Sequence, residues 1–146
     1  MIAVPLGADV WITSNSRTHW AAKARKVKQI RTLAAYIARV AQTKGQLPRT
    51  RPHWHTEHPC EVTAWVSYPP TVGAAQADPA NAEPAVKAIM DGLTDAGVWS
   101  DDNALVVRAL TYRRGPNVQL DRRLKKNSWH QIRLEIRDYS TEGASE

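Results

Sequence analysis

Acidic side chains and one lysine gather in a single short segment of the chain. Asp78 opens this segment, and the adjacent acids Asp101 and Asp102 close it. Lys87 and Asp91 lie between them. Carboxylates that share a site raise one another's pKa unless a cation neutralises them. Because oxygen ligands select hard divalent ions, the segment predicts a Mg²⁺ site in which Mn²⁺ can substitute.

The charge of the whole chain indicates what such an ion would act on. The 146 residues include 20 Lys and Arg against 14 Asp and Glu, which gives a formal net charge of +6. Positive charge around a site attracts phosphate-bearing partners such as nucleic acid. A metal site in a basic chain therefore predicts metal-assisted cleavage of a phosphodiester.

A helix is expected to hold the middle of the acidic segment. Pro84 suits a first helical turn, and Gly97 fits the position just past a helix end. Between them, apolar residues recur at helical spacing and form one stripe: Val86, Ile89, Met90 and Leu93. Lys87 and Asp91 are four residues apart on one helix face, so Asp91 either orients Lys87 or forms a simple surface ion pair with it.

This segment resembles the RusA family of Holliday-junction resolvases. The family pattern is Asp-x-Asp-Asn, a lysine, an aspartate four residues further on, and a Gly-(Val/Phe)-Trp-x-Asp-Asp ending. Here residues 78–81 read Asp-Pro-Ala-Asn, Lys87 and Asp91 follow, and residues 97–102 read Gly-Val-Trp-Ser-Asp-Asp. The spacings from Lys87 to Asp91 and from Asp91 to Asp101 agree with the family.

The chain departs from the family pattern beside its first acid. Ala80 stands where the family has its second acid, and a few extra residues separate Asn81 from Lys87. Glu83, within this insertion, can supply a replacement carboxylate if the chain bulges there. Alternatively, a main-chain carbonyl and waters complete the shell, which magnesium tolerates.

The resemblance implies roles for the matching side chains. It places magnesium between Asp78 and Asp102, with Asp101 either as a further ligand or as a hydrogen-bond acceptor for the metal's own ligands, and there the ion polarises the scissile phosphate and helps to generate hydroxide. It implies that Lys87 approaches the phosphate or the attacking water. Asn81 is expected to support the metal shell or the phosphate.

The resemblance also implies an activity and a partner. It predicts a magnesium-dependent endodeoxyribonuclease that resolves four-way DNA junctions by paired symmetric nicks, as a homodimer with two copies of one site. The family is common in phages and prophages, which suggests a role in DNA recombination and repair in the cytoplasm of a bacterial host. The alternative is a junction-binding protein of the same fold that is catalytically weakened or inactive, since Ala80 removes a family acid.

Periodicity along the chain predicts a single α+β domain over residues 1–146, in which two helices pack on a small mixed sheet. The order is strand–helix–strand–helix–strand–strand, which agrees with the RusA-like arrangement. Near-continuous apolarity predicts that the strand at 104–112 is central and covered on both faces. The tail from 139 is expected to fray. The other elements are expected at 2–6 (continuing into, or paired with, 10–13), 18–44, 61–68 and 129–137.

Polar and basic residues in three places are candidates for DNA contact, although each group can also be a plain solvated surface. Asn15 and Arg17 lie in a turn after the first strand, and Lys23 and Lys26 lie in the first half of the long helix. The densest positive charge is expected in a loop over residues 113–127: Arg113, Arg114, Arg122, Arg123, Lys125 and Lys126.

One loop offers different ligands. Residues 53–60 read His-Trp-His-Thr-Glu-His-Pro-Cys, which can ligate zinc or can simply lead into a strand, and whose spacing fits neither a finger nor a His-Glu-x-x-His helix. Cys60 is the only cysteine, which excludes an intrachain disulfide and fits a reducing, cytoplasmic interior. No apolar run approaches transmembrane length, so no membrane partner is expected.

Overall fold

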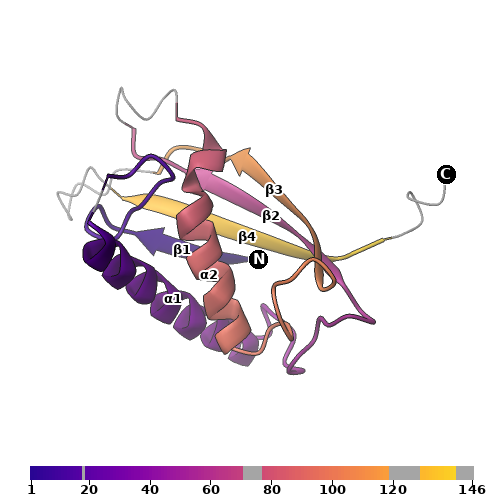
Figure 1. The fold of residues 1–146 in the computed structure, drawn as a ribbon. Helices are drawn as coiled ribbons and strands as arrows, with labels where there is room; N and C mark the ends of the chain where they lie inside the picture. The colour runs from indigo at the N-terminus through magenta and orange to yellow at the C-terminus, as the bar shows by residue number, and fades with distance from the viewer. Residues whose placement is uncertain (18, 71–76, 119–128, 141–146) are drawn as a thin grey trace.

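The structure, a computed structural model, describes residues 1–17, 19–70, 77–118 and 129–140. A four-stranded mixed sheet forms one layer, and two helices cover one of its faces as the second layer (Figure 1). The predicted α+β class and order of elements are therefore confirmed. The elements are β1 (Ile2–Leu6), α1 (Trp20–Thr43), β2 (Cys60–Ser67), the short 3₁₀ helix η2 (Pro79–Ala82), α2 (Glu83–Asp95), β3 (Val107–Arg114) and β4 (His130–Asp138).

The strand order is β1-β4-β2-β3, with β2 and β3 parallel and the other pairs antiparallel. The prediction of a central strand at 104–112 is wrong, because β3 begins at Val107 and forms an edge of the sheet. Arg108, Leu110 and Thr111 are exposed. Part of the apolar run precedes the strand, and Leu105 in that part is also exposed. The apolar run therefore does not coincide with a strand that is covered on both faces.

The second predicted piece of N-terminal strand, residues 10–13, is not a strand. The amides of Val10 and Trp11 both donate to the carbonyl of Gly7, at 3.1 and 3.0 Å, so the chain turns there. Ile12 is nevertheless fully buried. The apolar side chain of Ile12 is therefore explained by its burial in the core, although the residue does not pair with a strand of the sheet.

The core lies between the sheet and the helices. On β2, the buried residues alternate with partly exposed ones, and the buried set faces the helices: Cys60, Val62, Ala64 and Val66. All four residues of the stripe predicted on α2 are buried, which confirms that stripe. Gly92 lets α2 approach α1, because a Cβ there would meet the carbonyl oxygen of Arg31 at 2.5 Å. None of the helices in the described residues is both long and apolar enough to cross a membrane.

Candidate active site around Lys87 and Asp102

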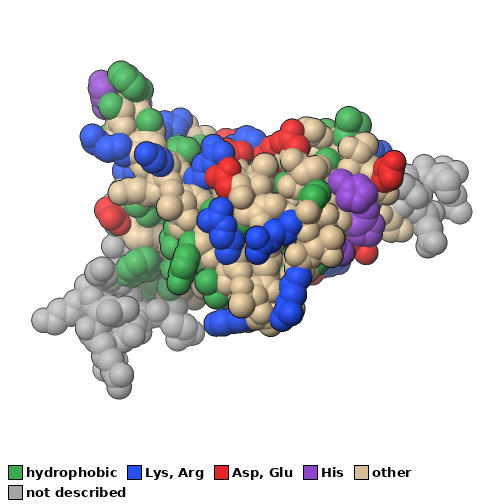
Figure 2. All heavy atoms as spheres, turned by 90° about the horizontal axis from the view of Figure 1, so that it is seen from below, with side chains coloured by type: hydrophobic (Ala, Val, Ile, Leu, Met, Phe, Trp, Pro, Cys, Tyr) green, Lys and Arg blue, Asp and Glu red, His purple; other side chains and the backbone are tan. Residues whose placement is uncertain are grey.

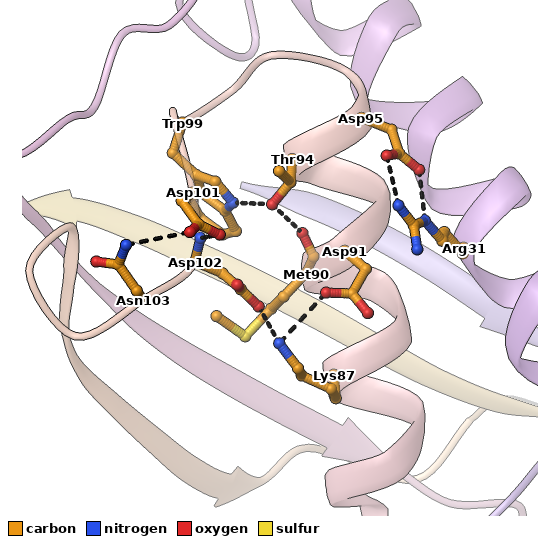
Figure 3. Close-up of polar contacts among 10 residues, drawn as sticks. All are labelled: Arg31, Lys87, Met90, Asp91, Thr94, Asp95, Trp99, Asp101, Asp102 and Asn103. Atoms are coloured by element: carbon orange, nitrogen blue, oxygen red, sulfur yellow. Dashed lines mark hydrogen bonds and ion pairs between the residues drawn. The ribbon is translucent and has the colours of Figure 1, made fainter.

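Lys87 lies between two carboxylates from different parts of the chain (Figure 3). Its ammonium contacts Asp91 Oδ1 at 3.3 Å, one helical turn further along α2. It also forms an ion pair and hydrogen bond with Asp102 Oδ2, from the loop that follows α2. The Asp102 side chain is 13% exposed, whereas that of Lys87 is 54% exposed. The fold thus brings together three of the residues that the sequence selected.

The ion pairs change the proton affinity of the lysine. The hydrogen bond from Lys87 to Asp102 raises the pKa of the lysine, and Asp91 adds to the effect, while partial burial opposes it. Lys87 therefore stays protonated at neutral pH. It can therefore offer positive charge or donate a hydrogen bond.

Asp101 and Asp102 lie in a turn that side chains close locally. Asp101 Oδ1 accepts from the Asp102 amide at 2.8 Å, and Asp101 Oδ2 accepts from Asn103 Nδ2 at 3.1 Å. These two hydrogen bonds lower the pKa of Asp101. Asn103 Oδ1 in turn accepts from the Leu105 amide at 2.9 Å. The Asp101 carboxylate is therefore exposed, but both of its oxygens accept hydrogen bonds within the turn. The Asp102 side chain instead points back toward Lys87.

The turn is anchored to α2 by a tryptophan. Trp99 is buried, and its Nε1 donates to Thr94 Oγ1 at 2.8 Å. Thr94 Oγ1 donates to the Met90 carbonyl at 3.2 Å (Figure 3). This chain of contacts fixes where the loop leaves the helix, and so where Asp102 lies.

Asp78 immediately precedes η2, and Asn81 lies within it. Asp78 Oδ1 accepts from the Ala80 amide at 2.9 Å, so this carboxylate caps the short helix while remaining exposed. Tyr68, just past the end of β2, donates its hydroxyl to the Asp78 carbonyl at 3.1 Å. Ser14 donates its amide to the Asn81 carbonyl at 2.9 Å and its hydroxyl to Asn81 Oδ1 at 3.3 Å.

The acids predicted as magnesium ligands do not form one compact group. Among the described residues, one set of three or more His, Cys, Asp or Glu has all its ligand atoms within 4.8 Å of one another, and its members are histidines and Asp138. Asp78, Asp101 and Asp102 are described but do not make such a set. Glu83 is exposed at the start of α2, and together with burial its charge raises the pKa of Tyr112 on β3.

The candidate DNA-contacting residues occupy different places. The predicted turn with Asn15 and Arg17 lies beside η2, because Ser14 bonds to Asn81, and both side chains are exposed. Lys23 is exposed on α1, and Lys26 Nζ donates to the Trp11 carbonyl at 3.5 Å. Lys and Arg side chains spread across the centre of the face that Figure 2 shows.

The two arginines at the end of β3 are both engaged within the protein. Arg114 Nη1 donates to the Ala77 carbonyl at 3.1 Å, and its guanidinium lies 4.5 Å from the centre of the Tyr68 ring. Arg113 lies over Trp65 at 4.9 Å, on the sheet face away from the helices. The other four predicted contacts, Arg122, Arg123, Lys125 and Lys126, lie outside the described residues.

Sequence reasoning missed the residues that tie the site together. Ser14 and Tyr68 hold the Asp78–Asn81 turn from segments distant in the chain, and Trp99 with Thr94 holds the Asp102 loop. A serine in a polar turn and a tyrosine at a strand end carry no local signal of such contacts.

Comparison with protein-family models and with curated proteins finds no match to this chain.

Proposed function

We propose that this protein is a magnesium-dependent endodeoxyribonuclease that nicks four-way DNA junctions, acting as a homodimer. The observation that carries the proposal is the contact of Lys87 with both Asp91 and Asp102. These are residues whose spacing matches the RusA pattern. An exposed cation fixed by two acids suits a group that meets a phosphate as negative charge develops on it.

Magnesium is the cofactor that the proposal implies, and the donor chemistry fits. Asp78 and Asp102 offer carboxylate oxygens, the ligands that this hard ion takes, and magnesium needs only one or two of them because it keeps several waters. Asp101 would support the ion indirectly, because its carboxylate accepts a hydrogen bond from the Asp102 amide and so holds the turn that carries Asp102. When bound, magnesium would polarise the scissile phosphate and lower the pKa of a bound water.

The protein's own residues supply positioning and charge. Asp91 and Asp102 hold the Lys87 ammonium at a defined place beside α2. The lysine side chain therefore loses less conformational entropy when it binds a phosphate. Since its raised pKa keeps Lys87 protonated, it would stabilise charge on the phosphate oxygens. Asn15 and Arg17, beside η2, would contact the DNA backbone next to Asp78.

A second function is favoured by one observation at the same site. Ala80 replaces a family acid, and the three remaining candidate ligands do not form a compact set in the described chain. A protein of this kind would bind the junction without cutting it. Ala80→Asp tests this alternative, because Ala80 is exposed and adjoins the Asp78 cap, so a carboxylate there can join the metal shell without disturbing the core.

The deciding experiment compares nicking of a synthetic four-way junction with that of a linear duplex of the same sequence, with and without Mg²⁺. The proposal predicts paired symmetric nicks on the junction only, and only with the metal. Tight binding to the junction without nicks, even with Mn²⁺, would instead support the alternative function, a protein that binds the junction without cutting it. In that case Ala80→Asp should gain Mg²⁺-dependent nicking, whereas in a working nuclease it should lower the Mg²⁺ concentration needed for half-maximal nicking.

A further inference from the structure

Two histidines and an aspartate meet at the end of the sheet remote from η2. The ligand atoms of His53, His58 and Asp138 all lie within 4.8 Å of one another. His58 Nε2 is 3.1 Å from Asp138 Oδ1, and the rings of His53 and His58 meet edge to face with centres 5.2 Å apart. Histidine side chains gather at this end of the molecule in Figure 2.

Strand pairing brings these residues together across a long stretch of chain. β2 and β4 are antiparallel, with Cys60 opposite Asp138. The amide of Tyr139 also donates to the Pro59 carbonyl at 3.0 Å, which holds the end of β4 against the approach to β2. His58, two residues before β2, is therefore placed beside the last residue of β4.

The loop that carries the histidines has its own fixed shape. His55 and His58 exchange two backbone hydrogen bonds, of 3.1 and 3.0 Å, and so close a tight turn whose tip is Thr56 and Glu57. The amides of His53 and Trp54 both donate to the Val98 carbonyl, at 3.2 and 3.3 Å. The imidazoles thus project from backbone that is already ordered, so little ordering would be needed to bind a ligand.

The donor set matches one class of metal ion. Two imidazoles and one carboxylate suit a borderline ion such as Zn²⁺, which commonly takes three protein ligands and a water. Trp54 Nε1 donates to Asp138 Oδ1 at 2.9 Å and so orients that carboxylate. Such an outer hydrogen bond is typical around metal ligands.

The other candidate ligands of this loop are excluded by their positions. Cys60 is fully buried and faces the core, and burial raises the pKa of its thiol to about 12, so it does not offer a thiolate. Glu57 is exposed at the tip of the turn and is not in the compact set. The structure thus reduces the broad zinc hypothesis for residues 53–60 to two of its residues and adds one from β4.

We propose that His53, His58 and Asp138 bind one Zn²⁺ ion per chain. The ion would join the 53–58 loop to the end of β4. The Trp54 carbonyl also accepts a hydrogen bond from the Ser100 amide at 3.0 Å, in the segment that leads to Asp101. A metal bound here would therefore restrict the motion of the segment that carries the candidate active-site acids. The proposal does not rest on the nuclease function, since none of its ligands belongs to that site.

The test is calorimetric titration of chelator-treated, full-length protein with Zn²⁺, repeated with Co²⁺ followed by its visible absorption. We expect one ion per chain, and a Zn²⁺-dependent rise in the melting temperature. His58→Ala and Asp138→Asn should each abolish stoichiometric binding and the thermal shift. Trp54→Phe, which removes the orienting donor together with part of a buried ring, should weaken binding by about tenfold.

Matched variants separate this site from its neighbours. His55→Ala removes an adjacent imidazole that is not in the compact set, and Asp102→Asn alters the candidate active site. Both should bind Zn²⁺ as the unaltered protein does. Binding that survives His58→Ala, or that is lost in His55→Ala, would overturn the assignment, as would the absence of a stoichiometric ion in the unaltered protein. If Zn²⁺ binding fails while Mg²⁺-dependent nicking persists, only this inference is lost.

Discussion

The two carboxylates that hold Lys87 differ in exposure: the Asp102 side chain is 13% exposed and the Asp91 side chain 30%. We predict that Asp102→Asn lowers the rate of junction nicking by at least about a hundredfold, because it removes both a metal ligand and the nearer anchor of the lysine. Junction binding should be unchanged or tighter, since the variant carries less negative charge near phosphate. Single-turnover nicking and a gel-shift titration measure the two effects.

Asp91→Asn is the matched control for that variant. It removes the other carboxylate in contact with Lys87 but not a proposed metal ligand. We expect a smaller loss of nicking, because Asp102 still holds the ammonium. Equal losses in the two variants would mean that Asp102 acts only by positioning Lys87, and unchanged nicking in Asp102→Asn would remove it from the active site.

The same ion pair should affect stability at high pH. Because the pKa of Lys87 is raised in the folded protein above its ordinary value of 10.5, the stabilisation is fully present below that value and is lost as the pH rises through the folded pKa. Since the lysine is half exposed, the contribution is small, about 0.5–1 kcal/mol. Urea unfolding should show Asp102→Asn less stable by this amount at pH 7, with the difference shrinking above pH ~10.5. A difference that grows in alkali would contradict the assignment.

At the scale of elements, the contact between α1 and α2 depends on the absence of a side chain at Gly92. A Cβ there would lie 2.5 Å from the Arg31 carbonyl oxygen and 2.9 Å from the Ala35 amide nitrogen, so helix backbone would have to move. We predict that Gly92→Ala destabilises the protein by about 2–3 kcal/mol, measured by urea unfolding. Gly45→Ala is the control, because its positive φ of 74° costs about 1 kcal/mol but a Cβ meets nothing within 4 Å. Equal losses would show that helix packing tolerates the methyl group.

The sequence predicted the helices and strands well, because the periodicity of apolar residues and the positions of helix-ending residues such as glycine are local properties of the chain. The stripe at Val86, Ile89, Met90 and Leu93 is buried, and the helix ends before Gly97, whose φ is positive. The place of a strand in the sheet is a different matter. β3 was expected to be central, but strand order depends on which partners are available, and here β4 takes the central place beside β2.

At the scale of the whole molecule, the candidate sites were predicted unequally. Lys87 and Asp91 share a helix, so their contact follows from spacing, whereas Asp102 was selected because residues 97–102 resemble the RusA pattern. The group at Asp138 was invisible from the sequence, because its aspartate lies 80 residues after His58 and only strand register brings the two together. The DNA contacts expected of Arg122, Arg123, Lys125 and Lys126 remain a prediction, because these residues lie outside the described ones.

The proposed dimer makes a prediction that concerns two copies at once. If each copy supplies one complete site, a mixture of equal amounts of unaltered protein and Asp102→Asn should, after subunit exchange, leave about half of the dimers with one active site. Such dimers can cut only one strand of a bound junction. Denaturing and native gels of a junction labelled on two strands should then show singly nicked, unresolved junctions that the unaltered protein alone does not accumulate. Mixing that merely dilutes the activity, with every cut junction still cut twice, would mean that the two nicks come from one copy and would remove the reason for the dimer.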